Sequence, residues 1–121
     1  MNNKKLGNWG EALAKRQLLK MGYQIIAQNL HLGRLELDLI AKKNNLITFF
    51  EIKTRLASDK SLKDNFLSQK QILNLKKAAS IYAAINCLSF EQLSFGLITI
   101  TLTDNLEKQK TGYINFYLNI F

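Results

Sequence analysis

A carboxylate and an ammonium group lie two residues apart at the end of the run Leu46-Ile-Thr-Phe-Phe-Glu-Ile-Lys53. The run is rich in β-branched and aromatic residues, which is typical of a β-strand. Residues i and i+2 of a strand point to the same face, so Glu51 and Lys53 share one. Asp38, in the alternating run 35–41, can point to that face from a neighbouring strand. Two carboxylates and one ammonium would then meet at one place on a sheet.

This grouping suits metal-assisted hydrolysis of a phosphodiester. Carboxylate oxygens favour hard cations such as Mg²⁺ or Mn²⁺, and such a cation activates water and stabilises charge on phosphate oxygens. We predict that Asp38 and Glu51 hold Mg²⁺ (or Mn²⁺), with the carbonyl of Ile52 as a further candidate ligand, and that Lys53 positions the attacking water. The alternative is that Glu51 and Lys53 form a solvated pair on an exposed strand face.

The charge of the chain favours a polyanionic partner. Seventeen Lys and Arg residues stand against nine Asp and Glu, which gives a net charge of +8. Such an excess in a small protein favours nucleic acid. Arg34, Arg55 and Lys70 flank the predicted site and are candidate contacts to phosphates. Alternatively, these three side chains are simply solvated.

The elements that must position this site follow from the periodicity of the apolar residues. We predict a helix over 6–21, strands over 23–29, 35–41 and 46–53, a loop over 57–65, a helix from 68 to about 86, strands over 93–102 and 112–121, and a charged turn over 103–111. Ser68 and Gln71 form a capping-box pattern for the second helix, and Gly22 suits the end of the first. The order α-β-β-β-α-β-β predicts an α/β (α+β) fold with a central mixed sheet flanked by helices.

Two further predictions concern the faces of the strand over 35–41 and the burial of Cys87. In the strand over 35–41, alternation places Glu36, Asp38 and Ile40 on one face and the remaining residues, Leu35, Leu37, Leu39 and Ala41, on the other. Cys87 shows no nucleophile motif and is predicted to be a small buried apolar residue.

Composition limits the class of protein. With 121 residues and 47% apolar residues, we expect a single domain spanning 1–121. One cysteine allows no internal disulfide and favours the reducing cytoplasm. No apolar run approaches the length that spans a membrane, so no membrane association is predicted.

Three segments together resemble the YraN family of small bacterial proteins, also called UPF0102. They are Gly7-Asn-Trp-Gly-Glu-Ala-Leu-Ala14, Glu36-Leu-Asp-Leu-Ile-Ala41 and Phe50-Glu-Ile-Lys-Thr-Arg55. The spacing of Asp38, Glu51 and Lys53 is also similar to that of the PD-(D/E)XK nuclease superfamily. This resemblance implies a restriction-endonuclease-like fold, with Asp38 and Glu51 as metal ligands and Lys53 as the catalytic lysine. It further implies that Glu11 joins the catalytic acids from the first helix, whereas the sequence by itself makes Glu11 an ordinary exposed residue.

Two positions depart from the family pattern. Leu35 stands where the family has Gly before the strand motif, so its side chain is expected to narrow the site. Gly96 stands where relatives often carry Asp. Neither departure removes Asp38, Glu51 or Lys53, although both leave open whether the protein is active. The role of Glu36 is a separate open question.

The sequence supports three functional hypotheses. The first is a metal-dependent endonuclease acting on DNA, with structured or branched DNA as a candidate substrate. The second is a non-catalytic nucleic-acid-binding module that retains the nuclease fold. The third is a protein-interaction role, in which an exposed C-terminal strand pairs with a partner or with a second copy to form a homodimer.

Overall fold

The computed structural model describes residues 3–57, 67–103 and 112–121. Its elements are α1 (Asn3–Lys20), β1 (Gln24–Leu32), β2 (Leu35–Lys43), β3 (Leu46–Leu56), α2 (Gln69–Ile85), the 3-10 helix η1 (Phe90–Gln92), β4 (Leu93–Leu102) and β5 (Gly112–Leu118). The predicted order α-β-β-β-α-β-β is confirmed, with η1 as an addition. The predicted loop over 57–65 and turn over 103–111 fall almost wholly outside the described residues.

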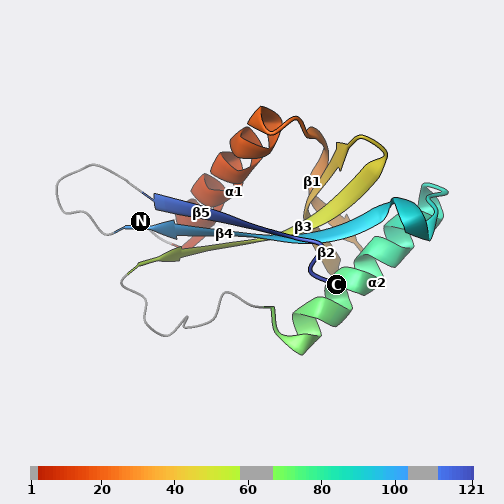
Figure 1. Cartoon of the computed structure of the whole chain (residues 1–121). Coiled ribbons are helices and arrows are strands. Elements are labelled where there is room, and N and C mark those ends of the chain that lie inside the picture. Colours follow the sequence, from red (N-terminus) through yellow and green to blue (C-terminus); the bar gives the residue numbers. More distant parts are fainter. Residues whose placement is uncertain (1–2, 58–66, 104–111) are drawn as a thin grey trace.

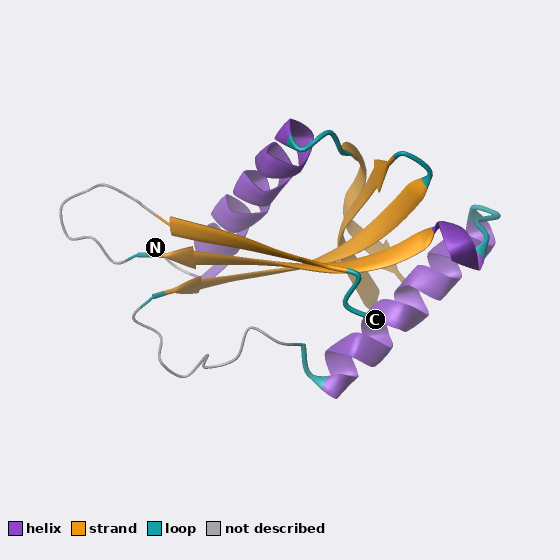
Figure 2. Ribbon diagram, in the orientation of Figure 1, coloured by secondary structure: helices purple, strands orange, loops and turns teal. Residues whose placement is uncertain are grey.

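The five strands form one mixed sheet in the order β1-β2-β3-β4-β5. Only β3 and β4 are parallel, because α2 carries the chain from the end of one to the start of the other. The other neighbours are antiparallel. Helix α1 covers one face of the sheet and α2 the opposite face (Figure 1, Figure 2). The fold is thus the mixed sheet with flanking helices that the sequence predicts.

Helix α1 packs closely on the sheet. Ala14 and Leu18 are fully buried against β2, β3 and β4, and a Cβ placed on Gly10 would overlap the side chain of Thr54. The chain leaves the helix at Gly22, whose φ of +93° is easy only for glycine. Met21 follows the last residue of α1 and is exposed.

Helix α2 begins as predicted. The Ser68 hydroxyl accepts a hydrogen bond from the Gln71 amide at 3.1 Å, and Gln71 Oε1 accepts one from the Ser68 amide at 2.8 Å. This capping box fixes the side chain of Gln71 at the start of the helix. Leu75, Ala78 and Ala79 then pack against the sheet.

The predicted alternation along β2 is wrong. Leu37 packs under α2, whereas Leu39, two residues on, packs under α1. The β1–β2 pairing passes from Gln28↔Leu39 to Leu30↔Leu37 with no pair between Asn29 and Asp38. Asn29 has a φ of +51°, a left-handed conformation that Asn adopts more readily than most residues. The irregularity at this point changes the face to which β2 presents its side chains and sets Asp38 apart from the regular pleat.

Cys87 is also misplaced by the sequence analysis, because it is exposed rather than buried. It follows the last turn of α2 with a φ of +55°, so the chain turns away from the core at this position. Among the helices that the structure describes, neither has the length and apolar character needed to cross a bilayer.

Candidate active site

Asp38 lies where β2 and β3 separate. Regular pairing between these strands stops at Leu39↔Phe50. Beyond it, Asp38 Oδ2 accepts a hydrogen bond from the main-chain amide of Ile52 at 2.9 Å. The carboxylate therefore takes the place of a main-chain acceptor, and it is fixed beside the residue that follows Glu51.

Glu51 and Asp38 form an acidic pair. Burial, the negative charge of Asp38 and a hydrogen bond between the two side chains together raise the pKa of Glu51 to about 8. Burial also raises the pKa of Asp38, against the lowering effect of the Ile52 amide and the Glu51 bond. In the metal-free protein the pair consequently favours a shared proton, with Glu51 as donor and Asp38 as acceptor.

Lys53 lies close to this pair, as the i, i+2 spacing predicts. Its positive charge lowers the pKa of Glu51. Its Nζ donates a hydrogen bond to Gln71 Oε1 at 3.1 Å. Because Gln71 also closes the capping box, the start of α2 determines where the lysine ammonium lies.

A pocket of about 190 Å³ opens beside Glu51. Its lining residues come from the β1–β2 turn, β2, β3 and α2: Arg34, Leu35, Glu36, Glu51, Gln71, Asn74 and Leu75. Arg34 is exposed, and it places a positive charge at the pocket that Glu51, a predicted catalytic residue, also lines. Leu35 forms part of the wall, and its effect on the width of the site stays a prediction.

Glu11 is held by a different contact. Its Oε2 accepts a hydrogen bond from Asn29 Nδ2 at 3.2 Å. The charge of Glu11 nevertheless raises the pKa of Asp38, which places it within electrostatic range of the pair. Within residues 3–57, 67–103 and 112–121, no three His, Cys, Asp or Glu side chains converge into a set that could hold a metal. The catalytic role of Glu11 stays a prediction.

The two other predicted phosphate contacts lie at the edges of this region. Arg55 is half-buried on β3, two residues beyond Lys53. Lys70 is exposed in the first turn of α2, next to Gln71. Their roles also stay predictions.

Sequence reasoning missed three polar residues around the site: Asn29, Gln71 and Asn74. Gln71 was recognised as a cap, but its second contact, to Lys53, depends on how α2 docks on the sheet. Asn29 offered a signal, since an Asn inside an apolar strand suggests an irregular backbone.

The chemistry of the acidic pair fits a divalent cation. Asp38 and Glu51 offer hard oxygen donors from adjacent strands, and the half-buried pair cannot hold two negative charges without cost. A cation would remove that cost. Among the described residues the pair supplies two carboxylates, so the main-chain carbonyl of Ile52, water or a phosphate oxygen would supply the remaining ligands.

The acidic pair predicts that the metal-free protein becomes less stable as pH rises. The folded protein retains the proton of Glu51 up to about pH 8, whereas the ordinary value is 4.5. Between these limits the folded state binds more protons than the unfolded state, so the free energy of unfolding falls with pH. Between pH 4.5 and about 8 we expect the free energy of unfolding, measured with urea in EDTA, to fall by on the order of a few kcal/mol. We expect a clearly smaller fall over the same range for Glu51→Gln. Equal pH slopes for the two proteins would contradict this assignment.

Comparison with known proteins places the chain in a family. The model of the uncharacterised protein family UPF0102 matches residues 10–100. A UPF0102 protein of Syntrophomonas wolfei is 37% identical over 98% of this chain and 99% of its own length. One from Caldanaerobacter subterraneus subsp. tengcongensis is 33% identical over 100% and 98%, and one from Flavobacterium psychrophilum is 35% identical over 78% and 79%. The chain, with its acidic pair between β2 and β3, therefore belongs to the UPF0102 family.

Proposed function

We propose that this protein hydrolyses phosphodiester bonds in DNA with the help of a divalent cation held by Asp38 and Glu51. One observation carries the proposal: two half-buried carboxylates from adjacent strands lie together, and burial is the largest cause of the raised pKa of each. Pairs of titratable groups with strongly shifted pKa values are typical of functional sites. The PD-(D/E)XK resemblance points to the same residues.

Each residue of the site has a distinct role in the proposal. The cation, when bound, would activate a water molecule and stabilise charge on the scissile phosphate. Asp38, oriented by the Ile52 amide, and Glu51 would hold it. Lys53 interacts electrostatically with Glu51 and is positioned by its hydrogen bond to Gln71. Its ammonium would orient the attacking water or neutralise the charge that develops on the phosphate.

The charge of the protein supports nucleic acid as the substrate. A net charge of +8 attracts a polyanion. Arg34 lines the pocket beside Glu51, so its guanidinium could bind a phosphate oxygen close to the acidic pair. Arg55 and Lys70 would contact flanking phosphates.

A second candidate is the non-catalytic module, which binds nucleic acid through the same basic residues. The hydrogen bond of Lys53 to Gln71 favours it, because an ammonium engaged in a structural contact has one donor fewer for catalysis. Binding without cleavage would be its signature.

The test is cleavage of single-stranded, duplex and branched DNA by the wild-type protein in Mn²⁺, in Mg²⁺ and in EDTA. Cleavage products that appear only with a divalent cation would support the proposed hydrolase. Salt-sensitive DNA binding with no cleavage of any substrate in either metal would select the non-catalytic module.

A further inference from the structure

A second, larger pocket lies on the other flank of α2. It has a volume of about 500 Å³, within the usual range of about 300–1,000 Å³ for ligand sites. Residues Lys76, Ala79 and Ser80 line it from α2, whereas Gln71, Asn74 and Leu75 line the pocket beside Glu51. The helix therefore separates two pockets on the same side of the sheet.

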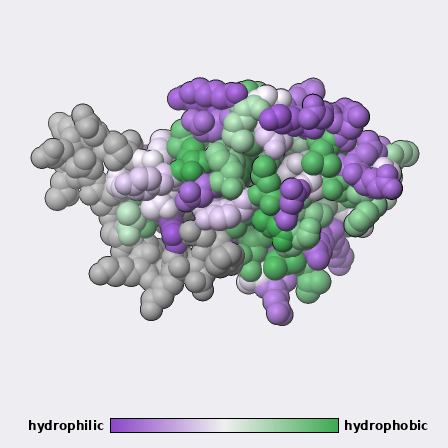
Figure 3. All heavy atoms as spheres, viewed as in Figure 1, coloured by the Kyte–Doolittle hydropathy of each residue, from purple (hydrophilic) through white to green (hydrophobic). Residues whose placement is uncertain are grey.

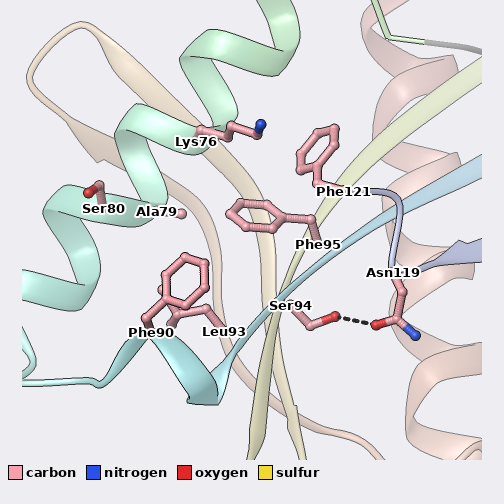
Figure 4. A pocket seen from close by; sticks show the side chains of 9 residues that line it. All are labelled: Lys76, Ala79, Ser80, Phe90, Leu93, Ser94, Phe95, Asn119 and Phe121. Carbon is pink, nitrogen blue, oxygen red and sulfur yellow. Dashed lines mark hydrogen bonds between the residues drawn. The ribbon is translucent and has the colours of Figure 1, made fainter.

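Aromatic rings form the walls of this second pocket. Phe90, from η1, is 86% exposed, so its ring contributes little to the core. The rings of Phe95 and Phe121 are 5.0 Å apart between centroids, and that of Phe121 is 46% exposed. All three rings border one open space (Figure 4). On this side of the molecule, hydrophobic residues gather near the C-terminal end of the chain and α2, with hydrophilic residues around them (Figure 3).

One end of the pocket carries an oriented amide. Asn119 has a φ of +53°, and its Oδ1 accepts a hydrogen bond from the Ser94 hydroxyl at 3.0 Å. This bond occupies the amide oxygen, and the amide nitrogen points away from Ser94 and from the three aromatic rings (Figure 4). The bond therefore joins the C-terminal residues, which include Phe121, to β4.

The opposite end of the pocket is positively charged. Lys76 Nζ lies 4.7 Å from the centroid of the Phe121 ring, a cation–π contact that holds the ammonium at the pocket. Helix α2 carries three lysines, Lys70, Lys76 and Lys77, and no acidic residue. A ligand at this end should therefore bear negative charge.

We infer that this aromatic pocket binds an unpaired nucleobase of single-stranded DNA, stacked on Phe90, with its phosphate near Lys76. Aromatic stacking faces and positive charge are the two features that binding sites for single strands combine. The helix is about 10 Å across, which about three stacked nucleotides would span. A strand that crosses the lysines of α2 could thus reach both the pocket and the acidic pair. The inference rests on the proposed function only in taking DNA as the ligand.

The test is binding of a 2-aminopurine-labelled single strand in EDTA, where no cleavage occurs. We expect the wild type to bind with quenched fluorescence, and Phe90→Ala to weaken binding by about 5- to 100-fold, the measured range for loss of one stacked base. Phe90→Trp should retain affinity and quenching. Tyr113→Ala is the matched control, since Tyr113 is a 66% exposed aromatic on β5 outside the pocket and its loss should change little.

Three outcomes would overturn the inference. Equal affinity of wild type and Phe90→Ala would exclude the pocket but not the acidic pair, whose cleavage of duplex or branched DNA is measured separately. Absence of binding of the single strand to the wild type would also overturn this inference, whereas the proposed function is decided by the separate cleavage assay with a divalent cation. The third outcome is that the wild type self-associates, that Phe90→Ala abolishes this self-association, and that 2-aminopurine fluorescence is not quenched. The pocket would then bind a second copy of the chain.

Discussion

Replacing Asp38 with Asn is expected to abolish metal-dependent cleavage while leaving the fold intact. The amide oxygen can still accept the hydrogen bond from Ile52, but it lacks the charge that holds a divalent cation. Loss of a Lewis-acid contribution of several kcal/mol corresponds to a decrease of at least about 10³-fold in rate. The measurement is the single-turnover cleavage rate at saturating Mn²⁺, with thermal unfolding of the same samples.

Glu36→Gln is the matched control for this substitution. Glu36 lies two residues before Asp38 on the same strand, but its side chain is exposed, and its charge is a minor cause of the raised pKa of both Asp38 and Glu51. We expect its cleavage rate to stay within about 10-fold of wild type, since exposed charges interact weakly. Cleavage by Asp38→Asn at the wild-type rate would refute the assignment of the acidic pair.

A second large effect is expected from Gly96→Ala. A Cβ at this position of β4 would lie 2.6 Å from two ring atoms of Phe50 and 3.3 Å from the main-chain oxygen of Tyr117. Phe50 is fully buried, so its ring has no free space into which to move. Overpacking of this kind costs about 1–3 kcal/mol, and we expect a corresponding decrease in the free energy of urea unfolding.

Gly7→Ala provides the same substitution with the opposite expected sign. Gly7 lies in α1, and a Cβ there would meet no atom within 4 Å. Because Ala favours a helix over Gly, we expect stabilisation of about 0.5–1 kcal/mol. Equal effects at the two positions would show that backbone preference, rather than the Phe50 contact, determines the result.

The close approach of Phe50 also limits which residue this fold can hold at position 96. A side chain as large as Asp could not fit there without moving the ring of Phe50.

Much of the architecture could be predicted from local signals. The capping box of Ser68 and Gln71, the glycine that ends α1 and the apolar runs fix the element order, because each depends on neighbours in sequence. The proximity of Asp38 and Glu51 followed from placing them on two strands joined as a hairpin, although the alternation predicted for β2 was wrong. The motifs also identified the UPF0102 family correctly.

What could not be predicted depends on contacts between distant segments. The irregularity at Asn29 and Asp38 breaks the alternation of β2, and nothing in the run over 35–41 signals it. The bond from Lys53 to Gln71 and the aromatic pocket of Phe90, Phe95 and Phe121 arise only when α2 and the C-terminal residues pack on the sheet. The sequence prediction placed Cys87 in the core because a cysteine without a nucleophile motif is usually buried, whereas the turn after α2 exposes it.

The most direct test of the acidic pair is calorimetric titration of Mn²⁺ into the wild type and into Asp38→Asn at pH 8, with circular dichroism to match their folding. We predict one binding site in the wild type, accompanied by proton release because Glu51 gives up its shared proton, and no such site in Asp38→Asn. Identical binding to both proteins, with no protons released, would contradict a metal held between β2 and β3.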